Sequence, residues 1–180
     1  MTTVVAIDTE TTGLGHNAEP KRDDAVIQVG IAWRDTKGKL ITWGSLCLPD
    51  PKYLLNGRAA RALEVNKLKL KDILAAPKDK VVADTLKTKL KNIGKVELRA
   101  YNVSFDAPFL SKKPWNIPKA AWGPCIMRSV SKHFELGYGN MKLEEALDKL
   151  ELKKPKGNFH NAETDAVTAL LIDEALNKRS

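Results

Sequence analysis

The chain has 180 residues, of which 43% are hydrophobic and 29% charged, and its formal net charge is +8. This size and composition are typical of one globular domain with a real core, so we expect a single domain over residues 1–180. No apolar run is long enough to cross a membrane and the N-terminus lacks a signal-peptide pattern, so we expect a cytoplasmic protein with no membrane contact. The excess of positive charge either keeps a lysine-rich surface soluble or attracts a polyanion such as nucleic acid.

The first third of the chain predicts an antiparallel meander. Residues 4–7 are apolar and mostly β-branched, which indicates a strand buried on both faces, and residues 14–24 form a polar loop. Residues 25–33 and 40–48 are expected strands joined by a turn at 36–39, so they predict a hairpin.

The rest of the chain alternates helices with strands. A fourth strand is expected at 96–101 and a fifth, weakly marked strand within 120–127. The expected helices span 58–66, 78–93, a segment that starts at Ser104, 128–135, 142–150 and 162–176, and residues 68–75 are ambiguous. A meander followed by this alternation predicts an α/β fold with a mixed five-stranded sheet and helices on both faces.

Two carboxylates stand one residue apart after the first strand. In an extended chain, residues i and i+2 point to the same side, so Asp8 and Glu10 would face one spot together. They would repel each other unless a cation lay between them, and Mg²⁺ prefers carboxylate oxygen. The alternative is a polar turn after a core strand, because Asp-x-Glu alone is common.

Further acidic residues follow later strands and helix starts. If the first and fourth strands are neighbours, Asp106 joins Asp8 and Glu10 at one edge of the sheet, and Asp165 lies in the first turn of the last helix. Four converging carboxylates are unfavourable without cations, and two divalent ions would roughly neutralise them, as in two-metal phosphoryl transfer. His160 could accept a proton from the attacking water. Taken singly, Asp106 and Asp165 could instead be helix-start carboxylates stabilised by the helix dipole.

Three segments in this order resemble the motifs of a known family. Residues 8–13 (DTETTG), 102–106 (NVSFD) and 160–166 (HNAETDA) are similar to the three exonuclease motifs of the DEDD 3′–5′ exonucleases. These are relatives of the proofreading subunit of bacterial replicative DNA polymerase, of RNase T and of oligoribonuclease. A histidine five residues before the last aspartate resembles the histidine (DEDDh) subgroup, whereas the tyrosine subgroup would have tyrosine at Asn161.

The resemblance implies an RNase H-like fold and a hydrolytic reaction. Two Mg²⁺ or Mn²⁺ ions would be bound by Asp8, Glu10, Asp106 and Asp165, and His160 would be the general base. The enzyme would release nucleoside monophosphates from the 3′ end of single-stranded or frayed nucleic acid, with DNA slightly favoured over RNA, which would connect it with DNA repair and proofreading.

The same resemblance implies contacts with the substrate. Thr11 would hold the terminal 3′-OH, Leu14 would wedge against the last base, and Asn102 and Phe105 would support the site together with His160. The alternatives are a loop-packing leucine, a turn asparagine and a core phenylalanine. The chain departs from the family pattern in four places, which leaves the substrate subclass open: Gln28, residues 65–67, Cys125 and the extended loop at 15–24.

Basic residues outside the motifs would recruit the strand. We expect Lys21, Arg22 and residues 153–156 to contact its phosphates, with bases stacked on apolar side chains. One rival hypothesis is a non-catalytic module of the same fold that binds nucleic acid or a polymerase, and another is an endonuclease of RNase H type. Whether the chain associates with a polymerase stays open at this stage.

Overall fold

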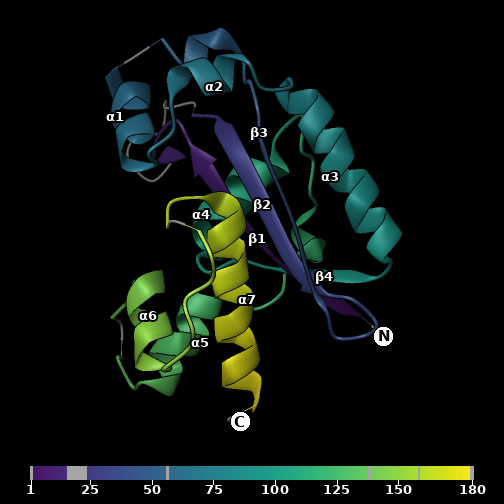
Figure 1. Cartoon of the computed structure of the whole chain (residues 1–180), viewed down its shortest axis with the longest axis vertical. Helices are drawn as coiled ribbons and strands as arrows, with labels where there is room; N and C mark the ends of the chain where they lie inside the picture. The colour runs from purple at the N-terminus through teal and green to yellow at the C-terminus, as the bar shows by residue number, and fades with distance from the viewer. Residues whose placement is uncertain (1, 16–23, 56, 138, 158, 179–180) are drawn as a thin grey trace.

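A four-stranded mixed sheet forms the centre of the molecule (Figure 1). The computed structural model describes residues 2–15, 24–55, 57–137, 139–157 and 159–178. The strands are β1 (Thr3–Thr11), β2 (Val26–Arg34), β3 (Leu40–Leu46) and β4 (Val96–Arg99), in the order β3-β2-β1-β4. Strand β2 pairs antiparallel with β1 and β3, and β4 pairs parallel with β1. The predicted hairpin and the predicted neighbourhood of the first and fourth strands are confirmed.

The predicted fifth strand does not form as a strand among the described residues. The chain makes a 3₁₀ turn at Lys119–Ala121, and Trp122 then makes an isolated parallel bridge with Leu98. The Gly123 N–H donates to the Leu98 carbonyl at 2.8 Å. Pro124 follows and has no N–H to donate, so the ladder cannot continue residue by residue. The mixed α/β architecture is confirmed, but the count of five strands is wrong.

The helices lie close to where the pattern of apolar residues predicts them. They are α1 (Gly57–Val65), α2 (Leu70–Leu74), α3 (Asp79–Ile93), α4 (Val103–Ser111), α5 (Ile126–His133), α6 (Leu143–Lys149) and α7 (Ala162–Lys178), with a further 3₁₀ turn at Pro51–Tyr53. The ambiguous segment 68–75 therefore contains a short helix. Within the described ranges, no helix has the length and apolar character needed to cross a membrane.

Apolar cores lie on the two faces of the sheet. Alternate residues of a strand point to opposite faces, so Val5 and Ile7 pack with residues of α3 and α4, whereas Ala6 packs with α5, α6 and α7. Figure 1 shows α7, in yellow, lying along the near face of the sheet, with α5 and α6 beside it. Helices on both faces are confirmed.

Helix α7 approaches the sheet unusually closely because small residues meet at the contact. Ala6 and Ala32 lie in the sheet, and Ala166 and Ala169 lie on α7, all buried in the same core. At Gly30 a Cβ atom would lie 2.2 Å from the carbonyl carbon of Ala162, so only glycine fits there. The first turn of α7 is therefore held at a fixed height above β2.

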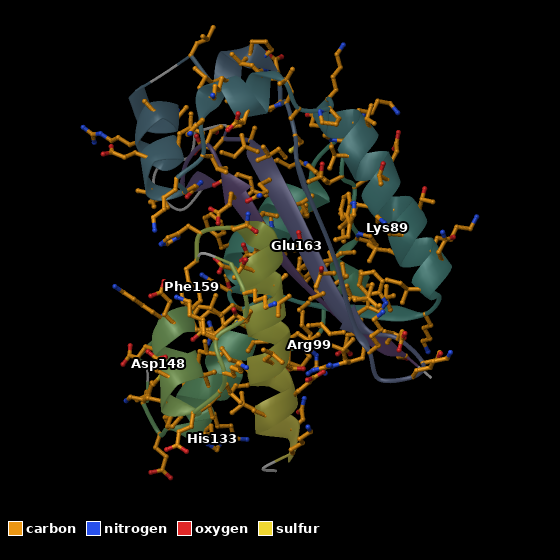
Figure 2. The ribbon with its side chains drawn as sticks, viewed as in Figure 1. Lys89, Arg99, His133, Asp148, Phe159 and Glu163 are labelled. Atoms are coloured by element: carbon orange, nitrogen blue, oxygen red, sulfur yellow. The ribbon has the colours of Figure 1, made fainter. Side chains whose placement is uncertain are left out.

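Ion pairs tie the later turns of α7 to the strands. Arg99 of β4 donates from Nη1 to both carboxylate oxygens of Asp173 at 2.7 and 2.8 Å, and from Nε to Glu97 at 2.8 Å. Arg34 of β2 makes a second pair with Glu174 at 2.8 Å. Figure 2 shows Arg99 beside the lower half of α7. These contacts fix the helix along its length as well as at its start.

Candidate active site

Strand β1 carries the first two acidic residues. Asp8 pairs with Gly30 and Glu10 with Gln28, so both lie inside the strand and not after it, because β2 keeps pairing with β1 through this region. They share the side of the strand that bears Ala6, which is the side covered by α7. The register of the β1–β2 pair shifts only after Glu10, at Thr11.

Asp106 reaches the same region from α4. Parallel β1 and β4 end at one edge of the sheet, and the chain leaving β4 enters α4, with Asp106 in its first turn. Its side chain is buried, and its Oδ1 accepts hydrogen bonds from the Thr9 N–H at 3.0 Å and the Thr9 hydroxyl at 2.8 Å. Burial raises the pKa of Asp106 to about 7, although the two bonds from Thr9 act to lower it.

Asp165 and His160 come from the start of α7 and the loop before it. The His160 backbone N–H donates to Asp165 Oδ2 at 3.1 Å, whereas Asp165 Oδ1 is buried and has no hydrogen-bond partner among the described residues. Glu10, His160 and Asp165 each offer a ligand atom, and these atoms lie within 4.8 Å of one another. Burial raises the pKa of Asp165 to about 6.

The four carboxylates influence one another electrostatically. Burial, followed by the charges of Asp106, Glu10 and Asp165, raises the pKa of Asp8 well above its ordinary value. Burial and the charges of Asp165 and Asp106 raise the pKa of Glu10 to about 8. Hard oxygen donors that hold protons near neutral pH, together with the unpaired Oδ1 of Asp165, form a site that fits a divalent cation.

A cavity of about 390 Å³ opens on one side of these carboxylates. Glu10, Thr11, Leu14 and Phe105 line it, together with residues of α1. Leu14 is 68% exposed, so it is not a buried loop-packing leucine. Phe105 is half-buried and its ring lies 5.3 Å from that of Phe109. The residues expected to contact the last nucleotide therefore surround one hollow next to Glu10.

A second cavity, of about 550 Å³, opens on the other side and contains Asn102, Met127, Phe159, His160 and Asp165. Figure 2 shows Phe159 between α6 and the N-terminal part of α7. Glu10 thus lines one hollow with Thr11, Leu14 and Phe105, and Asp165 lines the other with Asn102 and His160.

Basic residues of the loop before α7 form the rim of a third hollow, of about 640 Å³, which is lined by Lys153, Lys154 and Lys156 with Thr42 of β3. Lys154 Nζ lies 4.1 Å from the centre of the Phe159 ring, which makes a cation–π contact. Lys21 and Arg22, the other residues expected to recruit the strand, lie outside the described residues.

Several residues that build the site were missed by the sequence analysis. Gln28 Oε1 accepts a hydrogen bond from the Ala162 N–H at 3.1 Å and so fixes the start of α7. A polar residue in an otherwise apolar buried strand was the available signal. Arg58 and Arg61 of α1 line the cavity beside Leu14. Nothing in the sequence indicated that these two arginines line a cavity, because arginines on an amphipathic helix are ordinary surface residues.

Comparisons with known proteins agree with this geometry. A family model described as Exonuclease (RNase_T) matches residues 5–172, whereas a search of curated proteins gives no match. The nuclease domain of 3′hExo, a DEDDh family member bound to rAMP, superposes with a TM-score of 0.78 at 18% identity, covering 99% of this chain and 92% of that one. Exonuclease X in complex with 5′-overhanging duplex DNA superposes with a TM-score of 0.65 at 21% identity, and the match covers 97% of this chain and 92% of that one.

Cell-death related nuclease 4 gives a TM-score of 0.76 at 14% identity, covering 99% of this chain. The chain spans only 64% of that protein, which is less than two thirds of its length. Structural matches at identities this low show only a common fold. Membership of the family is shown by the family model, which matches nearly the whole chain. The chain belongs to the exonuclease family.

Proposed function

We propose that this chain is a metal-dependent 3′–5′ exonuclease, built as one domain over residues 1–180. It would release nucleoside monophosphates from the 3′ end of single-stranded or frayed nucleic acid. The observation that carries this proposal is the gathering of four carboxylates from β1, α4 and α7, with one buried Asp165 oxygen left without a partner among the described residues.

The proposed metal ligands are Asp8, Glu10, Asp106 and Asp165, holding two Mg²⁺ or Mn²⁺ ions. Such ions, when bound, would activate water and stabilise the leaving oxygen of the phosphodiester. The raised pKa values of these carboxylates support the proposal, because groups that resist ionisation without a cation gain most from binding one.

His160 is the proposed general base. Its side chain is exposed, and its backbone is tied to Asp165 Oδ2, so the imidazole stays beside the carboxylates while it remains open to solvent and substrate. In the reaction, it would take the proton of the attacking water and release that proton to solvent afterwards. Asp165 would thus hold the loop in place in addition to its role as a ligand.

The 3′-terminal nucleotide is proposed to occupy the cavity next to Glu10. Thr11 would hold the 3′-OH, Leu14 would wedge against the base and Phe105 would support the site, and all three line this cavity. Asn102 would support the site from the other side of the carboxylates. Residues 153–156 would contact phosphates of the strand, because their lysines form the rim of the nearby third hollow.

DNA remains slightly favoured as the substrate. The matched structures include one with rAMP and one with duplex DNA, so both kinds of nucleotide are found among proteins of this fold. The sugar preference therefore needs a direct measurement on matched substrates.

The test is digestion of 5′-labelled single-stranded DNA and RNA of one sequence, with Mg²⁺, Mn²⁺ or EDTA. We expect a metal-dependent ladder that shortens from the 3′ end, abolished in Asp8→Ala and unchanged in Asp148→Ala, a matched removal of an exposed carboxylate on α6. His160→Ala should lower turnover more than binding. Cleavage of a circular single strand would indicate an endonuclease. Binding without any cleavage would replace the proposal with a non-catalytic nucleic-acid or polymerase-binding module.

A further inference from the structure

Asp24 is a buried carboxylate that the proposed reaction does not use. Its side chain is 2% exposed, and its Oδ2 accepts a hydrogen bond from the Gly15 N–H at 3.0 Å. Its Oδ1 is buried without a hydrogen-bond partner in the part of the chain that the structure describes. A buried carboxylate with one unbonded oxygen is costly, and Asp24 lies in the wall of the cavity proposed for the terminal nucleotide.

The Oδ2 side of Asp24 holds the turn that carries Leu14. A Cβ atom on Gly13 would lie 2.6 Å from each of the two carboxylate oxygens, so the backbone of the turn packs directly against Asp24. Gly15 has a φ of +65°, and a Cβ there would lie 2.8 Å from the ring of Phe109. The turn is therefore enclosed between a carboxylate and an aromatic ring, and Leu14 at its tip projects into the cavity.

Backbone hydrogen bonds reinforce the same contact. The Thr12 N–H donates to the Ala25 carbonyl at 2.9 Å, and the Ala25 N–H donates to the Thr12 hydroxyl at 2.9 Å. With the bond between Gly15 and Asp24, these join the two ends of the segment 16–23, which itself lies outside the described residues. The position of Leu14 is thus set by residues on both sides of that segment.

The Oδ1 side of Asp24 faces the opposite wall. Arg58 of α1 places its Nε 4.0 Å from Oδ1, an ion pair across the cavity wall. Ala62 and Val65 of the same helix line the cavity with Arg58. A single carboxylate therefore contacts the Leu14 turn through a hydrogen bond and α1 through charge, and the spacing between the two walls depends on it.

We infer that Asp24 is a positioning residue for the 3′-terminal nucleotide, which fixes the Leu14 turn relative to α1. This inference rests on the proposed function, because it takes the terminal nucleotide as the occupant of the cavity. It predicts that Asp24 governs nucleotide affinity and leaves the carboxylates on β1, α4 and α7 in place.

The test compares Asp24→Ala and Asp24→Asn with the matched control Asp148→Ala, which removes an exposed carboxylate on α6 (Figure 2). The probes are AMP titrated with Mn²⁺ present, and cleavage of a single strand. We expect Asp24→Ala to raise the Kd for AMP and the KM for the strand about tenfold, with kcat changed less than about twofold. Asp24→Asn, which can still accept the Gly15 N–H but loses the charge that faces Arg58, should recover part of that loss.

A lowered Tm with unchanged Kd and KM would overturn the inference, since Asp24 would then serve only to stabilise the fold. If Asp24→Ala does not fold, the Kd for AMP is measured in Gly13→Ala instead, because the added Cβ would displace the Asp24 carboxylate from the turn. A raised Kd for AMP in that variant supports the inference, and an unchanged Kd overturns it. If the wild-type protein cleaves no strand, the proposed reaction fails, while the AMP titration still tests the role of Asp24.

Discussion

Binding of Mg²⁺ to the metal-free protein should displace protons from the carboxylates. In the folded protein, burial and the charges of Asp165 and Asp106 raise the pKa of Glu10 to about 8. Burial raises the pKa of Asp106 to about 7, and burial and neighbouring charges raise that of Asp8. A carboxylate must be ionised to ligate a divalent cation, so each proton held by the site has to leave as the ion binds.

The number of protons follows from these pKa values. At pH 7, Glu10 is about nine-tenths protonated and Asp106 about half, so together they hold roughly 1.4 protons, and Asp8 adds to this number. At pH 9 the same two groups hold only about 0.1 proton. The share of the proton release that comes from Glu10 and Asp106 should therefore fall steeply between pH 7 and pH 9.

The sign of the effect on stability follows from the same shifts. The folded state binds more protons than the unfolded state between about pH 4 and pH 8, so the metal-free protein loses stability as the pH rises through this range. Metal ions compensate the charge, so the rise in Tm that Mg²⁺ produces should be larger at pH 8 than at pH 5.5.

Isothermal titration calorimetry in buffers of different ionisation enthalpy measures the protons released. Glu10→Gln should lower the number of protons released at pH 7, whereas Asp148→Ala should leave it unchanged. Metal binding with no proton release at pH 7, or a smaller rise in Tm at pH 8 than at pH 5.5, would refute this account of the site.

Three further substitutions test how the site is held. Gly30→Ala should destabilise the protein by about 1–3 kcal/mol or more in urea and weaken Mn²⁺ binding, because its Cβ collides with the backbone at Ala162. Gln28→Leu should lower kcat about tenfold, because the Ala162 N–H loses its acceptor, whereas Gln28→Glu should largely preserve it. Arg99→Met should cost about 3 kcal/mol in a thermal melt, because the largely buried Asp173 loses its ion-pair partner, with kcat of the folded protein unchanged.

Much of the fold followed from patterns that depend on near neighbours in the sequence. The hairpin of β2 and β3 and the long helix α3 were predicted correctly, because alternation and helical spacing are local signals. The expected end of strand β1 was wrong. The strand was expected to end at residue 7, with the polar residues 8–11 following it, but pairing with β2 keeps them inside the strand. The fifth strand failed because Pro124 interrupts the hydrogen bonds that a strand beside β4 would need.

The acidic residues could be named from sequence because their chemistry is unusual at each position. The residues that hold these acidic side chains in place could not be named from sequence, because each of them acts through a contact with a residue far along the chain. Gln28 contacts Ala162 across 134 residues, and the role of Gly30 is visible only when the backbone of α7 lies on it. Asp24 looked like part of a polar loop, and only its burial against Gly13 and Gly15 distinguishes it.

The close packing of α7 on β1 and β2 also affects when the site can form during synthesis on the ribosome. Asp8 and Glu10 are translated well before Asp165 and the helix that carries it, and the parallel partner β4 comes in between. Contacts this distant in sequence form late in folding. A nascent chain that lacks α7 therefore carries an incomplete set of carboxylates, and the proposed hydrolysis of nucleic acid requires that this helix has docked.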